Sequence, residues 1–312
     1  MIFAYHRLAR SWEGYAWWKP LVTAVIGAAI YLALSLVLGV VSLALAFAFP
    51  SFFGDFLEKL TSFDLDLSDP LIFAFTLGSI ALLLPSVILA TLIMGPRPIG
   101  LLSSAAGRLR WRWLLRCVPL ALAVYAVVFG LSFLVLDPLT GAEPLRAAVG
   151  PSTIALIVLA LVLTPIQATA EEYVFRGFLG QTIGGWLRHP AWAILLPVPL
   201  FAIGHDYDVW GILDVSIFAV FAGWLTWRTR GLEAAIAAHV VNNTILFVLG
   251  AFDLVDMNAD SGSLYSLLTT LVIMAAYSAL VVWQARRIAL PTTRTLHPAA
   301  PPVAVPALTL GP

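Results

Sequence analysis

Long apolar blocks constrain this chain more than any other feature of its sequence. Eight blocks of 14 to 29 residues carry few or no charged side chains, and short polar segments separate them. A helix that crosses a bilayer needs about 20 such residues. Only 11% of the residues are charged and 61% are apolar, whereas an ordinary soluble domain has roughly 25% charged residues. We therefore predict an all-α, polytopic membrane protein, a bundle of about eight transmembrane helices.

The predicted crossings are residues 21–49, 71–94, 117–136, 151–170 and onward, 191–204, 211–225, 232–252 and 264–283. The fifth and sixth are shorter than a straight crossing requires, so we expect them to be tilted, extended by polar neighbours or shielded by other helices. The first is too long for the apolar part of a cleaved signal peptide. It is expected to remain in the mature chain.

Basic residues alternate from loop to loop in the way that sets membrane orientation. The N-terminal segment and the loops after the second, fourth, sixth and eighth crossings hold 15 of the 17 basic residues, and the opposite loops hold only Lys59 and Arg146. Those opposite loops carry acids instead, among them Asp55, Asp137 and Asp256. Because cytoplasmic loops collect Lys and Arg, we predict a multi-pass protein of the cell membrane, in contact with lipid, with both termini in the cytoplasm.

The sequence divides into five predicted parts. These are a cytoplasmic N-terminal segment (1–20), about three N-terminal transmembrane helices (21–150), a core (151–252), a C-terminal transmembrane helix (253–290) and a Pro-rich disordered tail (291–312). The net charge of zero indicates no nucleic-acid partner. The single cysteine, Cys117, excludes an intramolecular disulfide and a Cys-based metal site. Oligomeric state does not follow from the sequence.

Ionisable side chains inside the apolar blocks gather in the core. An ionisable group in hydrocarbon costs about 2.5 to 3.5 kcal/mol, so each one is a candidate functional residue. In AEEYVFRGF, Glu172 and Arg176 are four residues apart, the spacing of an ion pair on one helix face. Glu171 lies about 100° away around the helix and is left available for chemistry. The alternative is that all three are charges at the membrane surface.

Two histidines lie in apolar blocks of the core. His239 and Asn243 are four residues apart in HVVNN and share one helix face, where they could hold a water, a metal or an oxyanion; alternatively, they are polar residues that pack helices together. His205 ends the fifth block. Glu171 and His205 lie equally far along the sequence from Arg188, so an antiparallel helical pair would place them at similar depth. Asp214 is a lone acid that we expect at the interface.

The three clusters resemble one known family. EEYVFR fits the pattern EExxxR, FAIGH (residues 201–205) fits FxxxH, and HVVNN (residues 239–243) fits HxxxN, in that order. Together they resemble the CPBP family of intramembrane proteases, also called the CAAX-protease or Abi family. The resemblance covers roughly residues 150–250. It assigns no role to Glu233, which lies outside the three motifs. It implies an endopeptidase with its active site in a membrane cavity open to the cytoplasm, acting on membrane-anchored peptides or proteins, prenylated or bearing a leader peptide.

The resemblance implies roles for the residues that match. Glu171 is expected to be the general base, with His205 sharing the attacking water and His239 with Asn243 stabilising the oxyanion. Glu172 and Arg176 are expected to support them. This preferred mechanism requires no cofactor. In the other version, His205 and His239, with Glu171, bind zinc, and the metal activates the water.

Two other functions remain open on the sequence. Charged and imidazole groups inside a helix bundle also build proton pathways, so a proton-coupled transporter is one alternative. The clustering of polar groups in one half of the chain and the lack of an evident inverted repeat disfavour it. A non-catalytic immunity or scaffold member of the family is the other alternative, which the intact motifs disfavour.

Overall fold

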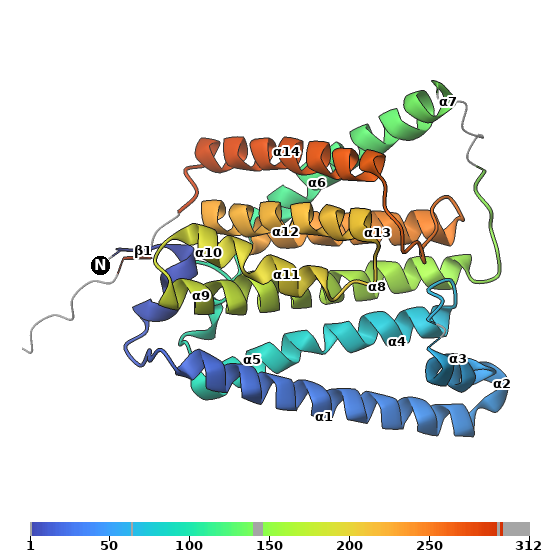
Figure 1. Ribbon diagram of the computed structural model, residues 1–312, viewed down its shortest axis with the longest axis horizontal. Coiled ribbons are helices and arrows are strands. Elements are labelled where there is room, and N and C mark those ends of the chain that lie inside the picture. Colours follow the sequence, from blue (N-terminus) through green and yellow to red (C-terminus); the bar gives the residue numbers. More distant parts are fainter. Residues whose placement is uncertain (1, 64, 140–145, 292–293, 296–312) are drawn as a thin grey trace, which may run out of the picture.

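The computed structural model describes residues 2–63, 65–139, 146–291 and 294–295, and it is helical almost throughout (Figure 1). The predicted all-α membrane bundle is confirmed, with seven helices long and apolar enough to cross a membrane within the described residues. The Pro-rich tail beyond Thr295, and the acids Asp64 and Glu143, lie outside them.

Seven of the eight predicted crossings are long helices or runs of stacked helices. They are α1 (Lys19–Ala48), α4 with α5 (Pro70–Ala81 and Leu83–Met94), α6 with the π-helical η3 (Trp111–Leu131 and Ser132–Leu136), α8 with η4 and α9 (Thr153–Glu172, Tyr173–Leu179 and Gly180–Trp186), α12 (Val209–Thr229), α13 (Glu233–Ala251) and α14 (Leu264–Arg287). The sixth crossing is thus a 21-residue helix, because Val209 and Trp210 extend the apolar block at its start and residues 226–229 extend it at its end.

The fifth predicted crossing is not one long helix. It forms two six-residue helices, α10 (Pro190–Leu195) and α11 (Pro197–Ala202), since Pro197 cannot donate a backbone hydrogen bond to a continuing helix. The pair runs back beside α9 and η4 (Figure 1). His205 is half-buried in the link that follows α11.

The remaining described elements are short. They are β1 (Ile2–Phe3), the 3-10 helix η1 (Tyr5–Ser11), α2 (Pro50–Phe53), α3 (Phe56–Ser62), η2 (Ile99–Leu101), α7 (Asp137–Leu139) and β2 (Arg294–Thr295). β1 and β2 pair antiparallel. Arg294 and Thr295, near the start of the predicted tail, therefore lie beside the N-terminus, and the disorder of the tail from residue 291 stays a prediction.

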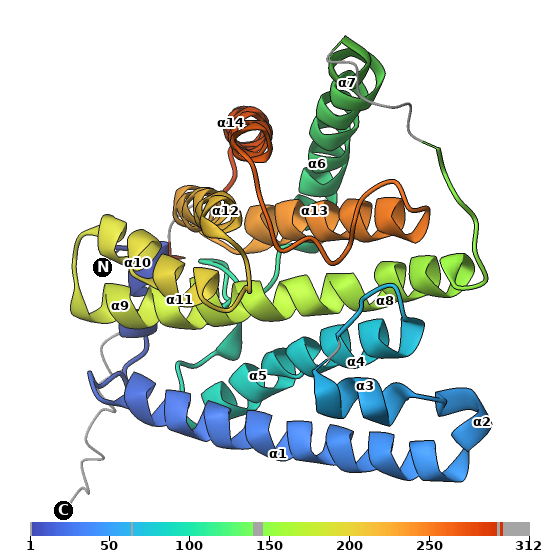
Figure 2. The ribbon, with the colours of Figure 1, turned by 45° about the vertical axis from the view of Figure 1, so that its right-hand side comes forward.

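Helix α13 lies at the centre of the bundle. It packs between α8 and α6, while α12 packs on α14 and α1 packs on α5 (Figure 2). Four alanines of α13, Ala234, Ala235, Ala237 and Ala238, are fully buried, because small side chains let helices approach closely within a bilayer. In contrast, α1 leaves large apolar side chains such as Val25 and Leu36 exposed, as expected for a lipid-facing surface.

The paired glycines at the end of the fourth crossing do not break the helix. Helix α9 continues through Gly184 and Gly185 to Trp186, and the glycines make room for the N-terminal segment. A Cβ atom at Gly184 would overlap the carbonyl oxygen of His6. Arg10 Nε donates to the carbonyl of Gly185 at 2.7 Å. The paired glycines therefore mark a close contact between two segments of the chain and not the end of a helix.

Candidate active site

The glutamate pair ends the α-helical part of the fourth crossing and faces α13. Glu172 closes α8, and the π-helical η4 follows it directly. A π-helical turn changes the direction of the side chains around it and occurs often at functional sites. Both glutamates consequently reach one imidazole: His239 Nδ1 lies 2.8 Å from Glu172 Oε1, and His239 Nε2 lies 3.3 Å from Glu171 Oε2.

Arg176 completes this buried network. Its Nη1 donates to Glu172 Oε1 at 2.8 Å, which is the i,i+4 ion pair predicted from the sequence. Its guanidinium lies 4.3 Å from the ring centroid of Phe201, and the rings of Phe201 and Phe218 both pack edge-on to His239. The aromatic rings therefore enclose the charged groups and keep them away from lipid.

Glu171 and Glu172 differ in how they can act. Glu172 is fully buried and its Oε1 accepts from both Arg176 and His239. Glu171 is 9% exposed, and its Oε2 has only the 3.3 Å contact with His239 Nε2; among the described residues, neither this atom nor Glu172 Oε2 makes a hydrogen bond. A buried carboxylate oxygen without a partner is costly. Because Glu172 is fully enclosed and Arg176 and His239 hold its Oε1, the partly exposed Glu171 is the member of the pair that a water or substrate can reach.

His205 lies in the link between α11 and α12. Its Nδ1 is 3.0 Å from the carbonyl oxygen of Phe201, and its ring packs against the rings of Phe201 and Tyr207. Since a carbonyl can only accept, the neutral ring carries its proton on Nδ1 and leaves Nε2 as an acceptor. Within the described residues, His205 makes no ion pair or hydrogen bond with Glu171; the ring of Phe201 touches both histidines.

A chain of side-chain amides fixes the orientation of Asn243. Tyr125 Oη donates to Asn242 Oδ1 at 2.9 Å, Asn242 Nδ2 donates to Asn243 Oδ1 at 2.9 Å, and Asn243 Nδ2 reaches Gln167 Oε1 at 3.4 Å. Asn243 therefore presents its Nδ2 group and retains one N–H for a further acceptor. Asn242 was noticed in the sequence, but its part in this chain was not predicted.

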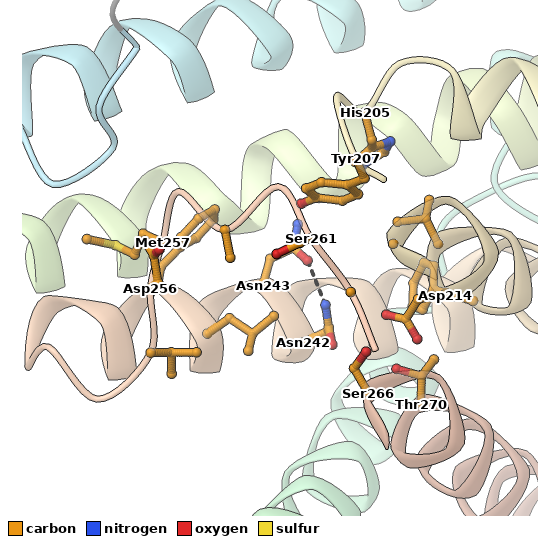
Figure 3. A pocket seen from close by; sticks show the side chains of 18 of the residues that line it. His205, Tyr207, Asp214, Asn242, Asn243, Asp256, Met257, Ser261, Ser266 and Thr270 are labelled. Carbon is orange, nitrogen blue, oxygen red and sulfur yellow. Dashed lines mark hydrogen bonds between the residues drawn. The ribbon is translucent and has the colours of Figure 1, made fainter. Parts of the chain in front are cut away.

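His205, His239 and Asn243 line one cavity of about 310 Å³ (Figure 3). Tyr207 and His205 lie on one side of it, Asp214, Ser266 and Thr270 on another, and Asn242 and Asn243 between them. The loop between α13 and α14 supplies further lining residues, from Val255 to Gly262. The structure thus joins the FxxxH and HxxxN motifs at one cavity, with the glutamate pair in contact through His239.

The cavity lies toward the acidic end of the bundle. Its walls include the N-terminal ends of α12 and α14 and the loop that carries Asp253, Asp256 and Asp260. Asp208 links the start of α12 to the loop before α14. Its Oδ1 accepts hydrogen bonds from the backbone N–H groups of Gly211 at 2.8 Å and Gly262 at 2.9 Å. These N–H groups hold the pKa of the Asp208 carboxyl below its usual value. The family resemblance implies a cavity open to the cytoplasm, and the basic residues predict cytoplasmic termini. Because the cavity lies toward the acidic end of the bundle, these two expectations conflict.

The arrangement does not fit a zinc site formed by Glu171, His205 and His239. In the part of the chain that the structure describes, no three His, Cys, Asp or Glu side chains lie together in a way that could hold a metal ion. Both nitrogens of His239 face carboxylate oxygens. His205 packs on the ring of Phe201, and its Nδ1 faces the carbonyl oxygen of Phe201.

Two residues of the cavity were not predicted to belong to it. Asp214 was expected at the interface, yet it lines the cavity, and its position as a lone acid in an apolar block was the available signal. Tyr207 carries no signal in the sequence.

Glu233 has a structural role: it begins α13 and pairs with Arg110 at 2.7 Å.

Comparisons with known proteins agree with the position of this site. Residues 150–245 match the family model described as type II CAAX prenyl endopeptidase Rce1-like. The chain is also similar to the uncharacterized protein YyaK of Bacillus subtilis (strain 168), with 28% identity over 240 residues, which cover 72% of this chain and 77% of that protein. A search of solved structures gave no significant match.

Proposed function

We propose that this chain, which matches the Rce1-like family model over residues 150–245, is an intramembrane endopeptidase of membrane-associated peptides of the CAAX-protease (CPBP) type. The observation that carries this proposal is the buried contact of Glu171, Glu172, Arg176 and His239 beside a cavity lined by His205 and Asn243. Peptide hydrolysis needs a base for water, donors for the oxyanion and a proton for the leaving amine, and this set of groups can supply all three.

In the proposed mechanism, Glu171 takes a proton from the attacking water. The partial exposure of Glu171 and the available Nε2 of His205 support this pair of roles. The oxyanion receives hydrogen bonds from Asn243 Nδ2 and from the Nε2–H of a doubly protonated His239, whose Nδ1–H stays bound to Glu172. The proton on Glu171 then passes to the leaving amine. Glu172 and Arg176 are positioning residues, because they reach the reaction only through His239.

Reconstitution with a peptide library tests the proposal. The purified full chain would be placed in liposomes with membrane-anchored peptides, prenylated and unprenylated, and the products identified by mass spectrometry. We expect cleavage at a defined bond that empty liposomes do not show and that survives exhaustive chelation. Cleavage lost on chelation and restored by zinc would replace the glutamate mechanism by a metal one. No cleavage of any peptide, with proton-driven solute uptake instead, would favour the transporter; neither activity would favour an immunity or scaffold role.

We further propose that the cavity opens on the non-cytoplasmic side. The support is the charge distribution, because the basic residues gather at the opposite end of the bundle from the cavity loop and cytoplasmic loops are rich in Lys and Arg. We expect a cysteine at the exposed Asp256, in a Cys117→Ser background, to react with a membrane-impermeant maleimide on intact cells. Arg287→Cys, at the end of α14, is expected to react only after permeabilisation. The reverse pattern would place the termini outside and the cavity toward the cytoplasm.

A further inference from the structure

Asp214 places a carboxylate in the wall of the candidate active site. It lies near the start of α12, on the side of the helix that faces α14, and Figure 3 shows its side chain opposite Ser266 and Thr270. Its Oδ1 is buried and has no hydrogen-bond partner among the described residues. A carboxylate within a membrane-spanning segment is costly, so this acid calls for a function that uses its charge.

Among the described residues, no Lys or Arg side chain lines the cavity around Asp214. The polar groups that line it are two histidines, two asparagines, three hydroxyl groups of Ser261, Ser266 and Thr270, the phenol of Tyr207 and a second acid, Asp256. Arg176 is engaged by Glu172 and by the face of Phe201. Lys59, one of two basic residues in the loops of the acidic end, pairs with Asp55 and Asp69.

The rest of the lining suits the aliphatic stem of a basic side chain. Val215 and Phe218 follow Asp214 on α12, and Leu246 and Phe247 line the cavity from α13. Lys and Arg bury their methylene groups on apolar surface while the charged end reaches a polar partner. A cavity of about 310 Å³ with apolar walls, one carboxylate and neighbouring hydroxyl groups therefore matches such a side chain in shape and charge.

We propose that Asp214 is a specificity-determining residue that binds the ammonium or guanidinium group of a Lys or Arg residue in the substrate peptide. The inference rests on the proposed peptidase function, since it assigns the peptide to the same cavity as His205, His239 and Asn243. The basic side chain lies between α12 and α14, while the peptide backbone passes the histidines and Asn243. A peptide with one basic residue near the cleaved bond is then the preferred substrate.

The test compares cleavage of two scanning sets of apolar, fluorophore-labelled decapeptides in liposomes. One position at a time holds Lys in the first set and norleucine, which lacks the ammonium group, in the second. We expect one position at which Lys raises kcat/KM by roughly 30-fold or more, since loss of one partner from a desolvated charge pair has an effect of this order. Asp214→Asn is expected to remove that preference, and Asp214→Glu to retain most of it.

A control variant separates a specific contact from the general charge of the cavity. Asp256 also lines the cavity but is exposed on the loop, so Asp256→Asn is expected to keep the Lys preference. A preference that survives Asp214→Asn, or that falls equally in Asp256→Asn, would overturn the inference, as would equal cleavage of both sets by the unaltered protein.

Binding measured without cleavage separates this inference from the proposed function. Fluorescence anisotropy of the same peptides with the Glu171→Gln protein reports recognition alone, with and without Asp214→Asn. In one outcome, the unaltered protein cleaves no peptide, while binding still shows a Lys preference that Asp214→Asn removes. This result would support the cation site and contradict the peptidase function. Cleavage without a Lys preference would remove only the cation site. Absence of both binding and cleavage would overturn both.

Discussion

Substitution of Glu171 by Gln is expected to lower kcat for peptide cleavage by about 10²- to 10⁴-fold, the usual contribution of a general base, with little change in KM. Gln keeps the shape of the side chain but cannot accept the water proton. Because Arg176 is paired with Glu172 and not with Glu171, the substitution leaves the buried ion pair intact. Steady-state kinetics with one peptide substrate, alongside thermal unfolding of both proteins in detergent, measures the effect.

Glu172→Gln is the matched comparison, because the two side chains are neighbours with different partners. Glu172 is fully buried and bonded to both Arg176 and His239, so its neutral replacement leaves Arg176 without a counter-charge. We expect this variant to lose thermal stability as well as activity, whereas Glu171→Gln loses activity alone. Full activity in Glu171→Gln, with activity lost and stability unchanged in Glu172→Gln, would exchange the roles assigned to the two glutamates.

The parts of the fold that follow from local composition could be predicted. Apolar block length decided where helices cross, and spacing within one helix predicted the Glu172–Arg176 pair, which has 2.8 Å between its charged atoms. Both are properties of a few consecutive turns. The co-occurrence of three polar motifs in apolar blocks likewise indicated a shared site, and His205, His239 and Asn243 do line one cavity.

Contacts between distant elements could not be predicted in the same way. Glu171 and Glu172 lie about 100° apart on an ideal helix, yet their carboxylates reach the two nitrogens of His239, and the π-helical η4 that follows Glu172 was not predicted. A π-helical turn depends on what packs against it, which no local pattern reports. Asp214 was assigned to the interface for a related reason: its neighbours across the cavity, Ser266 and Thr270, come from α14, and the loop before that helix closes the space.

The ion pair between Arg110 and Glu233 is the strongest structural link that the sequence did not reveal. Arg110 Nη2 donates to Glu233 Oε2 at 2.7 Å, Arg110 Nε donates to Oε1 at 2.9 Å, and the backbone N–H of Arg110 donates to Oε1 at 2.8 Å. Glu233 is fully buried at the start of α13. The neighbouring Gly231 permits this approach, because a Cβ atom there would overlap both charged groups.

Arg110→Ala is therefore expected to destabilise the protein by about 3 to 5 kcal/mol, the usual cost of removing one partner from a buried ion pair. At roughly 2 °C per kcal/mol for a chain of this size, the melting temperature should fall by about 6 to 10 °C. Thermal unfolding in detergent, followed by size-exclusion chromatography of the remaining folded protein, measures the shift. Arg112→Ala is the matched control, because Arg112 is an exposed arginine two residues further on, in the first turn of α6, and its loss should leave the melting temperature nearly unchanged.

The double variant Arg110→Met with Glu233→Met distinguishes a buried charge from a lost contact. If the cost of Arg110→Ala comes from leaving the Glu233 carboxylate buried and unpaired, removing both charges should recover most of the lost stability. A double variant as unstable as the sum of its single variants would instead mean that the hydrogen bonds themselves hold the start of α13. Because His239 and Asn243 lie further along this helix, a start of α13 held by these bonds would also position the site, and peptide cleavage would then fail to recover with the double substitution.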